Sequence, residues 1–226
     1  MDSLGDRIKS YEQVYNQKFT PNSCLFIRVD GKSFHTFTKH CSKPFDKIFM
    51  SDMVFAAVET SKEMQGFKLA YVQSDEVTFM LTDFDTLQTQ GWFGYELNKV
   101  VSVSASLFTA NFNYFYQLHP EGKLAVFDSR AFIVPKDDWQ NVFVWRHQDW
   151  IRNSISMMAH EKFGHSKLQN VNCQSMKEML REAGTHWEDQ PNRNKNGTFI
   201  LQDNSTCEPS RKLDYLSIDA LVDGLG

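Results

Sequence analysis

The sequence lacks any pair of cysteines spaced as a C-x-x-C motif or as part of a disulfide framework. Its four cysteines are scattered along the chain at Cys24, Cys41, Cys173 and Cys207, as expected for reduced thiols in a cytoplasmic protein. It has no apolar run near the ~20 residues of a membrane-spanning helix. Its first eight residues carry two acids and no apolar core typical of a signal peptide. We therefore expect a cytoplasmic protein that does not bind a membrane.

The sequence also has no excess of basic charge. Lysine and arginine number 24 against 28 aspartates and glutamates, for a net charge of −4. This balance argues against a protein that coats nucleic acid through its bulk charge, but it is compatible with a local basic groove. The content of 41% hydrophobic and 23% charged residues is that of a globular protein, and the 19 phenylalanines predict a largely aromatic core.

The hydrophobic pattern predicts an α+β fold. The strand-like apolar runs cover residues 24–29, 69–72, 77–81, 124–134 and 198–201. The segments with helical spacing or a helix-capping signature cover residues 4–16, 45–65, 92–118, 137–163 and the region after 175. Asn196-Gly197 is typical of a hairpin turn. This order suits a sheet with helices packed on one face.

Two short segments carry a carboxylate where a predicted strand ends. Residues 28–35 read Arg-Val-Asp-Gly-Lys-Ser-Phe-His, which places Asp30 after a buried strand and before a glycine that allows a turn. Residues 73–76 read Gln-Ser-Asp-Glu, which places Asp75 between two strand-like runs. If the two strands are neighbours, Asp30 and Asp75 face each other and can share divalent cations.

Such a pair of carboxylates predicts a magnesium site for nucleotidyl transfer. Mg²⁺ prefers oxygen ligands, commonly one or two carboxylates plus substrate phosphates; Asp30, the Gly31 carbonyl and Asp75 would supply such a set. Two ions held there could activate an attacking hydroxyl and neutralise a leaving pyrophosphate, while the N–H groups of residues 31–35 could cradle a triphosphate. Taken separately, Asp30 could be a turn or cap residue and Asp75 part of a solvated hairpin tip. Together they favour metal binding, as in polymerases and nucleotide cyclases.

Polar residues elsewhere are candidates for phosphate or RNA contacts. Lys43, before Pro44, is either a solvated lysine, which we favour, or a phosphate contact. Residues 145–154 read Trp-Arg-His-Gln-Asp-Trp-Ile-Arg-Asn-Ser. At helical spacing, one face of this segment carries Arg146, Asp149, Arg152 and Asn153. The pattern fits a ladder of ion pairs and an RNA or phosphate contact surface equally well.

Taken in order, these motifs resemble the tRNA(His) guanylyltransferase family. The resemblance covers roughly residues 1–202 and rests on residues 28–35, Lys43-Pro44, 73–76, Phe127-Asp-Ser-Arg130 and 145–149. It implies a palm-like catalytic domain with an antiparallel sheet over residues 1–135. Residues 136–203 would be a helical and hairpin part of the same unit, and residues 204–226 a polar tail.

The resemblance also implies an activity. Members of the family add nucleotides to the 5′ end of tRNA in the 3′-to-5′ direction. The 3′-hydroxyl of an incoming nucleotide attacks a 5′ end that ATP has activated or that already carries a triphosphate. The family commonly forms homotetramers that hold tRNA across subunits.

Carried over by motif, the catalytic residues would be Asp30 and Asp75, and the Mg²⁺ ligands would be Asp30, Gly31 through its carbonyl, and Asp75. The site for the nucleoside triphosphate, ATP or GTP, would comprise Asp30, Gly31, Lys32, Ser33, Phe34, His35, Ser74 and Asp75. The candidate phosphate or RNA contacts are Lys43, Arg130, Arg146, Arg152 and Asn153.

One stretch favours a particular branch of the family. Eukaryotic guanylyltransferases carry His-Ile-Asn-Asn after the Trp-Arg motif, whereas residues 149–154 here read Asp-Trp-Ile-Arg-Asn-Ser. This stretch and residues 184–191 are similar to the bacterial and archaeal guanylyltransferase-like branch, which favours template-directed repair of truncated tRNA 5′ ends. The alternatives are a dedicated tRNA(His) guanylyltransferase that adds one G at position −1, a nucleotide cyclase, and a tRNA-binding module without enzymatic activity.

Overall fold

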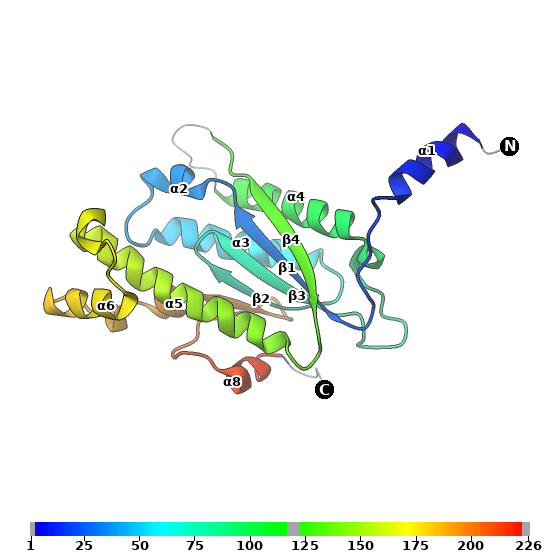
Figure 1. The fold of residues 1–226 in the computed structure, drawn as a ribbon. Coiled ribbons are helices and arrows are strands. Elements are labelled where there is room, and N and C mark those ends of the chain that lie inside the picture. Colours follow the sequence, from blue (N-terminus) through cyan, green and yellow to red (C-terminus); the bar gives the residue numbers. More distant parts are fainter. Residues whose placement is uncertain (1–2, 117–122, 223–226) are drawn as a thin grey trace.

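The centre of the protein is a six-stranded sheet in which every neighbouring pair is antiparallel, in the order β4-β1-β3-β2-β5-β6. The computed structural model describes residues 3–116 and 123–222 (Figure 1). The strands are β1 Cys24–Gly31, β2 Phe67–Gln73, β3 Glu76–Leu81, β4 Phe127–Val134, β5 Thr198–Leu201 and β6 Thr206–Cys207. The predicted α+β class and antiparallel sheet are confirmed.

The α-helices are α1 Leu4–Gln13, α2 Phe34–Phe37, α3 Lys47–Lys62, α4 Leu97–Phe115, α5 Trp139–Phe163, α6 Cys173–Glu182, α7 Asn192–Asn196 and α8 Tyr215–Asp219. Short 3₁₀ turns are η1 Thr38–His40, η2 Trp92–Tyr95, η3 His165–Leu168 and η4 Trp187–Asp189. Within the described ranges, no helix combines the length and apolar character needed to cross a bilayer.

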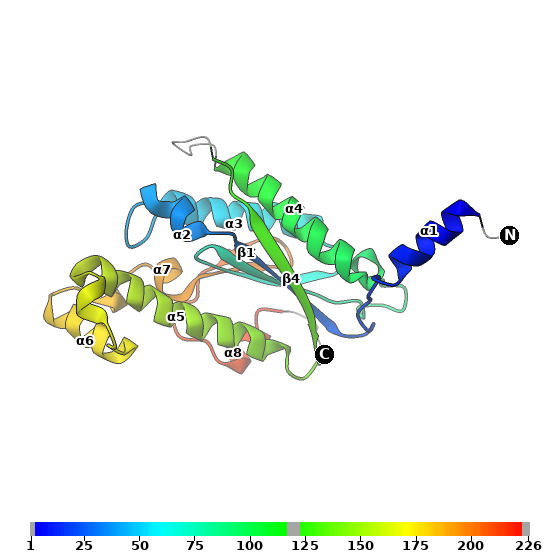
Figure 2. The same ribbon diagram turned by 45° about the horizontal axis from the view of Figure 1, so that its top comes forward.

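Alternating residues of β1 divide the core between the two faces of the sheet, because successive side chains of a strand point to opposite faces. Leu25, Ile27 and Val29 belong to the cluster that α3 and α4 cover. Phe26 belongs to a second cluster, with Phe143 of α5 and residues of α8. Figures 1 and 2 show α3 and α4 on one side of the sheet and α5 and α8 on the other. The sheet therefore lies between two helical layers.

The predicted helix 92–118 is divided near its start. Phe93 and Tyr95 have positive φ values of 51° and 61°, so η2 ends at Tyr95 and α4 begins at Leu97. Left-handed residues cannot continue a right-handed helix. The last two residues of the predicted helix lie outside the described residues.

The last segment of the chain is not a polar tail over the part that the structure describes. Residues 204–222 contain β6 and α8, and Leu213, Ile218 and Val222 are buried in the same cluster as α5. A few apolar residues in a polar stretch are enough to anchor it to the sheet. The predicted turn at Asn196-Gly197 is also wrong in type, since Asn196 ends α7 and Gly197, with φ 71°, leads directly into β5.

Candidate active site

The structure brings Asp30 and Asp75 together at one end of the sheet. β1 and β3 are paired strands with Asp30 opposite Glu76, and the Gly31 N–H donates to the Asp75 carbonyl oxygen at 3.0 Å. Both aspartates line a cavity of about 290 Å³. The condition set by the sequence, that the two strands be neighbours, is therefore met.

A tight turn places Asp75 at this cavity. Strands β2 and β3 are longer than the sequence predicted, so Gln73 pairs with Glu76 and only Ser74 and Asp75 remain in the turn. Ser74 has φ 48°, in the left-handed region that costs a residue with a Cβ about 1–2 kcal/mol. The ladder hydrogen bonds on both sides of the turn hold it in this conformation.

The surroundings of Asp75 oppose its negative charge. Burial raises the pKa of Asp75, hydrogen bonds from its own amide and from Ser74 partly offset this, and the nearby carboxylates of Asp30 and Glu76 raise the pKa further. Among the described residues, no Lys, Arg or His forms an ion pair with Asp30 or Asp75. A cation between the two carboxylates would relieve both the burial and the repulsion.

The oxygen ligands of this cavity fit a hard cation that is also bound by a backbone carbonyl and by substrate phosphates. In the described ranges, no group of three or more His, Cys, Asp or Glu side chains could hold a metal ion by itself. Two carboxylates completed by a backbone carbonyl and substrate phosphates are a usual arrangement for Mg²⁺. Asp30 and Asp75 therefore fit magnesium better than they fit a metal that is enclosed entirely by side chains.

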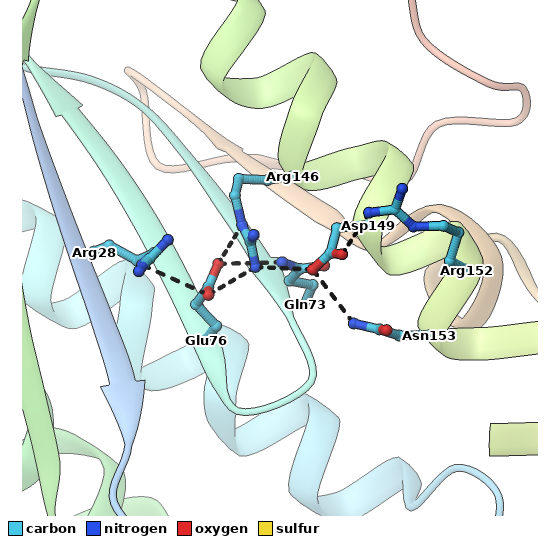
Figure 3. A network of polar contacts seen from close by, with 7 residues as sticks. All are labelled: Arg28, Gln73, Glu76, Arg146, Asp149, Arg152 and Asn153. Carbon is cyan, nitrogen blue, oxygen red and sulfur yellow. Dashed lines mark hydrogen bonds and ion pairs between the residues drawn. The ribbon is translucent and has the colours of Figure 1, made fainter. Parts of the chain in front are cut away.

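Glu76, next in the chain, takes part in a buried ionic network (Figure 3). Its carboxylate accepts two hydrogen bonds from Arg146, from Nε at 2.7 Å and from a terminal guanidinium nitrogen at 2.8 Å. Gln73 Nε2 donates to the same carboxylate at 3.1 Å, and Arg28 Nε lies 3.7 Å from it. Two arginines therefore compensate Glu76 and fix the hairpin that carries Asp75.

The ion-pair ladder predicted for the 145–154 segment is present in this network. Arg146 is buried, and besides Glu76 it contacts Asp149 at 3.2 Å, while Arg152 contacts Asp149 at 2.8 Å. Arg146 is thus a buried member of an ion-pair ladder. Because it also lines the cavity of Asp30 and Asp75, its contact with RNA or phosphate stays a prediction. Arg152 remains open to solvent, with 60% of its side chain exposed.

The remaining candidate contacts lie in different places. Asn153 lines the same cavity as Asp30 and Asp75. Lys43 lines an adjacent cavity of about 320 Å³ that also reaches His35, Ser74 and Asp75, and its Nζ donates to the Thr38 carbonyl at 3.1 Å. Arg130 lies apart from these cavities on the edge strand β4, where its Nε is 3.7 Å from Asp128 and its side chain is 59% exposed.

The predicted phosphate cradle at residues 31–35 is shorter than expected. The Gly31 amide donates to Asp75 and the Lys32 amide donates to Val126 at 2.9 Å. Among the described residues, only the amides of Ser33, Phe34 and His35 in this run have no backbone acceptor. The sheet therefore uses two of the five predicted donors, because β1 extends through Gly31.

Gly31 and Phe34 have structural roles that the sequence did not indicate. A Cβ on Gly31 would lie 2.3 Å from the Phe34 ring, so only glycine fits against it. That ring is buried and lies 4.7 Å from the Phe127 ring, centroid to centroid. The Phe34 side chain therefore belongs to the core, and only its backbone can face a nucleotide.

Five residues near the carboxylates were missed or given no role by the sequence analysis. The cavity of Asp30 and Asp75 is also lined by Gln73, Glu76, Trp150, Ser156 and Met157. Glu76 stands within the quoted 73–76 motif, so its position beside Asp75 was a signal. Trp150 is buried, and its Nε1 has no hydrogen-bond partner among the described residues; nothing in the local sequence distinguishes it from a core tryptophan.

Comparisons with known proteins agree with this geometry. The sequence model of the family described as "Thg1: tRNAHis guanylyltransferase" matches residues 5–135. A solved structure of a bacterial tRNA(His) guanylyltransferase (Thg1)-like protein in complex with ATP is 38% identical, has a TM-score of 0.89, and covers 96% of this chain and 95% of that chain. A second solved structure of the same description, in complex with GTP, is 36% identical with a TM-score of 0.81, and covers 97% of this chain and 96% of that chain.

A curated relative agrees as well. The probable tRNA(His) guanylyltransferase of Dictyostelium discoideum is 33% identical over 161 residues, which are 68% of this chain and 60% of that protein. The family model covers more than half of the chain, and the bacterial structures share its fold over nearly their whole length. The resemblance found in the motifs is confirmed, and this chain belongs to the tRNA(His) guanylyltransferase family.

Proposed function

We propose that this protein is a Mg²⁺-dependent nucleotidyltransferase that adds nucleotides to the 5′ end of tRNA in the 3′-to-5′ direction, with template-directed repair of truncated ends as its main reaction. The observation that carries the proposal is the meeting of Asp30 and Asp75 in one cavity, where neither carboxylate forms an ion pair with a described basic residue. Magnesium bound there would supply Lewis-acid stabilisation of phosphate charge and a more acidic attacking hydroxyl.

The chain's own residues position the reactants around this point. Asp30 and Asp75 would hold the cation, and the amides of Ser33, Phe34 and His35, which have no backbone acceptor among the described residues, could donate to phosphate oxygens. Lys43 and His35 line the adjacent cavity, which continues to Asp75. A triphosphate would therefore extend from the carboxylates toward basic side chains, with its charge balanced along its length.

The bacterial structures solved with ATP and with GTP support the nucleotide site. They also support assignment to the guanylyltransferase-like branch, and hence templated repair. The curated relatives named tRNA(His) guanylyltransferase favour the second candidate, addition of a single G to tRNA(His). Free cysteines support a reducing, cytoplasmic location.

We also propose a homotetramer. Helix α1 has no buried residue and extends away from the sheet in both views (Figures 1 and 2). Leu4 and Tyr11 of this helix, and Val14 directly after it, are more than half exposed, at 67%, 61% and 74%. An isolated helix of this length is marginal in water, so packing against another copy would explain it. A sedimentation measurement that finds only monomer at micromolar concentration would contradict this proposal.

The experiment is nucleotide addition with labelled GTP and ATP, Mg²⁺, and 5′-truncated tRNAs of several identities. Asp30→Asn and Asp75→Asn should abolish addition, whereas the exposed control Asp203→Asn should not. Because burial and two neighbouring carboxylates oppose the charge of Asp75, Asp75→Asn should unfold at a temperature no lower than wild type. Loss of activity with retained stability separates catalysis from folding.

The products distinguish the alternatives. Addition that follows the opposing base on several tRNAs supports repair, and addition of one G to tRNA(His) alone supports the second candidate. A cyclic product from nucleoside triphosphate without RNA would indicate a cyclase. Wild-type rates in Asp30→Asn or Asp75→Asn would refute the assigned site.

A further inference from the structure

A basic groove lies beside the proposed nucleotide site. It has a volume of about 670 Å³ and runs between the loop that follows α2 and the C-terminal end of α5. We call it the histidine-lysine groove after its basic lining residues, which are His35, Lys39, Lys43, His160 and His165. Among the described residues that line it, Glu161 is the only carboxylate. In a chain of net charge −4, this is a local reversal of sign.

The histidine-lysine groove continues the active-site cavities. It shares His35, Lys43 and Met157 with the cavity that reaches Ser74 and Asp75. The path from the carboxylates to the groove therefore changes from acidic to basic. A ligand in the groove would lie directly beside a nucleotide bound at the carboxylates.

The cationic groups of the groove are available to a ligand. Lys39 is exposed and forms no ion pair with a described carboxylate, and Lys43 donates only to a backbone carbonyl. The other wall carries His160 and His165, whose rings stack with centroids 5.2 Å apart and planes 20° apart. His165 is exposed and His160 is half-buried, so the stacked pair offers an aromatic surface at the groove.

We propose that the histidine-lysine groove binds a single-stranded segment of the RNA substrate, with Lys39 on the phosphates and the His160–His165 pair stacking against an unpaired base. Sites for single-stranded nucleic acid combine a basic groove with aromatic platforms in this way. The groove includes neither Asp30 nor Asp75, so its ligand lies beyond the triphosphate that these residues would hold. The inference rests on the proposed function, because a tRNA truncated at its 5′ end exposes unpaired template nucleotides.

The test measures RNA binding and nucleotide addition in the same variants. The probes are two labelled acceptor-stem hairpins, one blunt and one with a 5′ truncation that leaves a 3′-strand overhang. The variants are Lys39→Ala and the double variant His160→Ala/His165→Ala. The matched control is Lys62→Ala, at the far end of α3, where the lysine pairs with Glu59.

We expect the double histidine variant to bind the overhang hairpin about tenfold more weakly, which corresponds to the loss of one stacked base. Lys39→Ala should also weaken binding and reduce the slope of log Kd against log salt by about 0.7, the value for one phosphate contact of a single strand. The KM for nucleoside triphosphate and the kcat at saturating RNA should stay at wild-type values, as should every property of Lys62→Ala.

Three results would overturn the proposal. Unchanged RNA binding in both variants would remove the groove from recognition. A raised KM for nucleoside triphosphate with normal RNA binding would make the groove a triphosphate site. Equal losses for blunt and overhang hairpins would indicate duplex binding. A wild-type protein that adds no nucleotide to any tRNA would instead refute the proposed function, while the binding measurements would still test the groove.

Discussion

Replacing Arg146 by methionine should destabilise the protein severely, although the residue lies on an otherwise polar helical face. Its side chain is only 9% exposed and that of its partner Glu76 only 12%. Methionine has a similar length and keeps the packing, but it removes both hydrogen bonds to the carboxylate, at 2.7 and 2.8 Å. Glu76 would then keep only Gln73 at 3.1 Å and the more distant Arg28 at 3.7 Å.

The expected loss of unfolding free energy is about 3–5 kcal/mol, because removing one member of a buried pair leaves the other charge without compensation. Arg152→Met is the matched control on the same helix. Its side chain is 60% exposed and it pairs with Asp149, so its loss should cost less than about 1 kcal/mol. Arg146→Lys should fall between them, since lysine keeps the charge but cannot bind the carboxylate with two parallel hydrogen bonds.

Urea unfolding at pH 7, followed by circular dichroism, measures these differences. The double variant Arg146→Met/Glu76→Gln should recover most of the stability that Arg146→Met loses, because no unpaired charge is then buried. A loss below about 1 kcal/mol for Arg146→Met, or no recovery in the double variant, would refute the description of this pair as a buried, mutually dependent unit.

Three further predictions follow from buried groups. Burial lowers the pKa of His147 from 6.5 to about 4, so the unfolded chain binds the extra proton. The free energy of unfolding should therefore fall by about 3 kcal/mol as pH drops from ~6.5 to ~4, at 1.36 kcal/mol per pH unit. Urea unfolding of His147→Gln at several pH values should show a weaker dependence of this free energy on pH. Burial raises the pKa of Asp75, so the rate of nucleotide addition should begin to fall on acidification at a pH above the usual pKa range of an aspartate. The pH at which the rate falls should decrease as the Mg²⁺ concentration increases. A pH that does not depend on Mg²⁺ would contradict cation binding at Asp75. Gly66→Ala should cost more than about 2 kcal/mol in thermal unfolding, since φ is +81° and the new Cβ would lie 2.1 Å from the Thr82 carbonyl oxygen; a near-neutral result would refute this.

The sequence predicted those parts of the site that depend on local chemistry. Asp30 and Asp75 each follow a run of strand-forming residues, and a hairpin between 69–72 and 77–81 brings the second one to a strand end. Helix α5 was also predicted nearly to its ends, because Asp137-Asp138 before it and Gly164 after it are typical of a helix start and a helix end. Local patterns suffice where the partner of a residue lies in the same or the next element.

Contacts between distant segments could not be predicted in this way. Helical spacing placed Arg146, Asp149 and Arg152 on one face, but it could not show that Arg146 turns toward Glu76, 70 residues earlier. It likewise could not show that Leu213 and Ile218 cover the sheet, since a short apolar segment within a polar stretch gives a weak signal. The shortened phosphate cradle has the same origin, because the partner of the Lys32 amide, Val126, lies in a distant segment.

The two acids of the β2–β3 hairpin have opposite surroundings, and this difference supports the proposal that the site binds an external cation. Glu76 is held by Arg146 with a second arginine nearby, so the nearest basic side chains are already engaged. Asp75, one residue earlier, is buried beside Asp30 and Glu76, and in the described part of the chain no basic side chain pairs with it. If Arg146 or Arg28 faced Asp75 instead, the carboxylate would be neutralised internally and would bind a divalent ion weakly. The network around Glu76 thus pairs the guanidinium of Arg146 with Glu76 rather than with Asp75, and it leaves Asp75 beside Asp30, where we propose that a metal ion supplies the compensating charge.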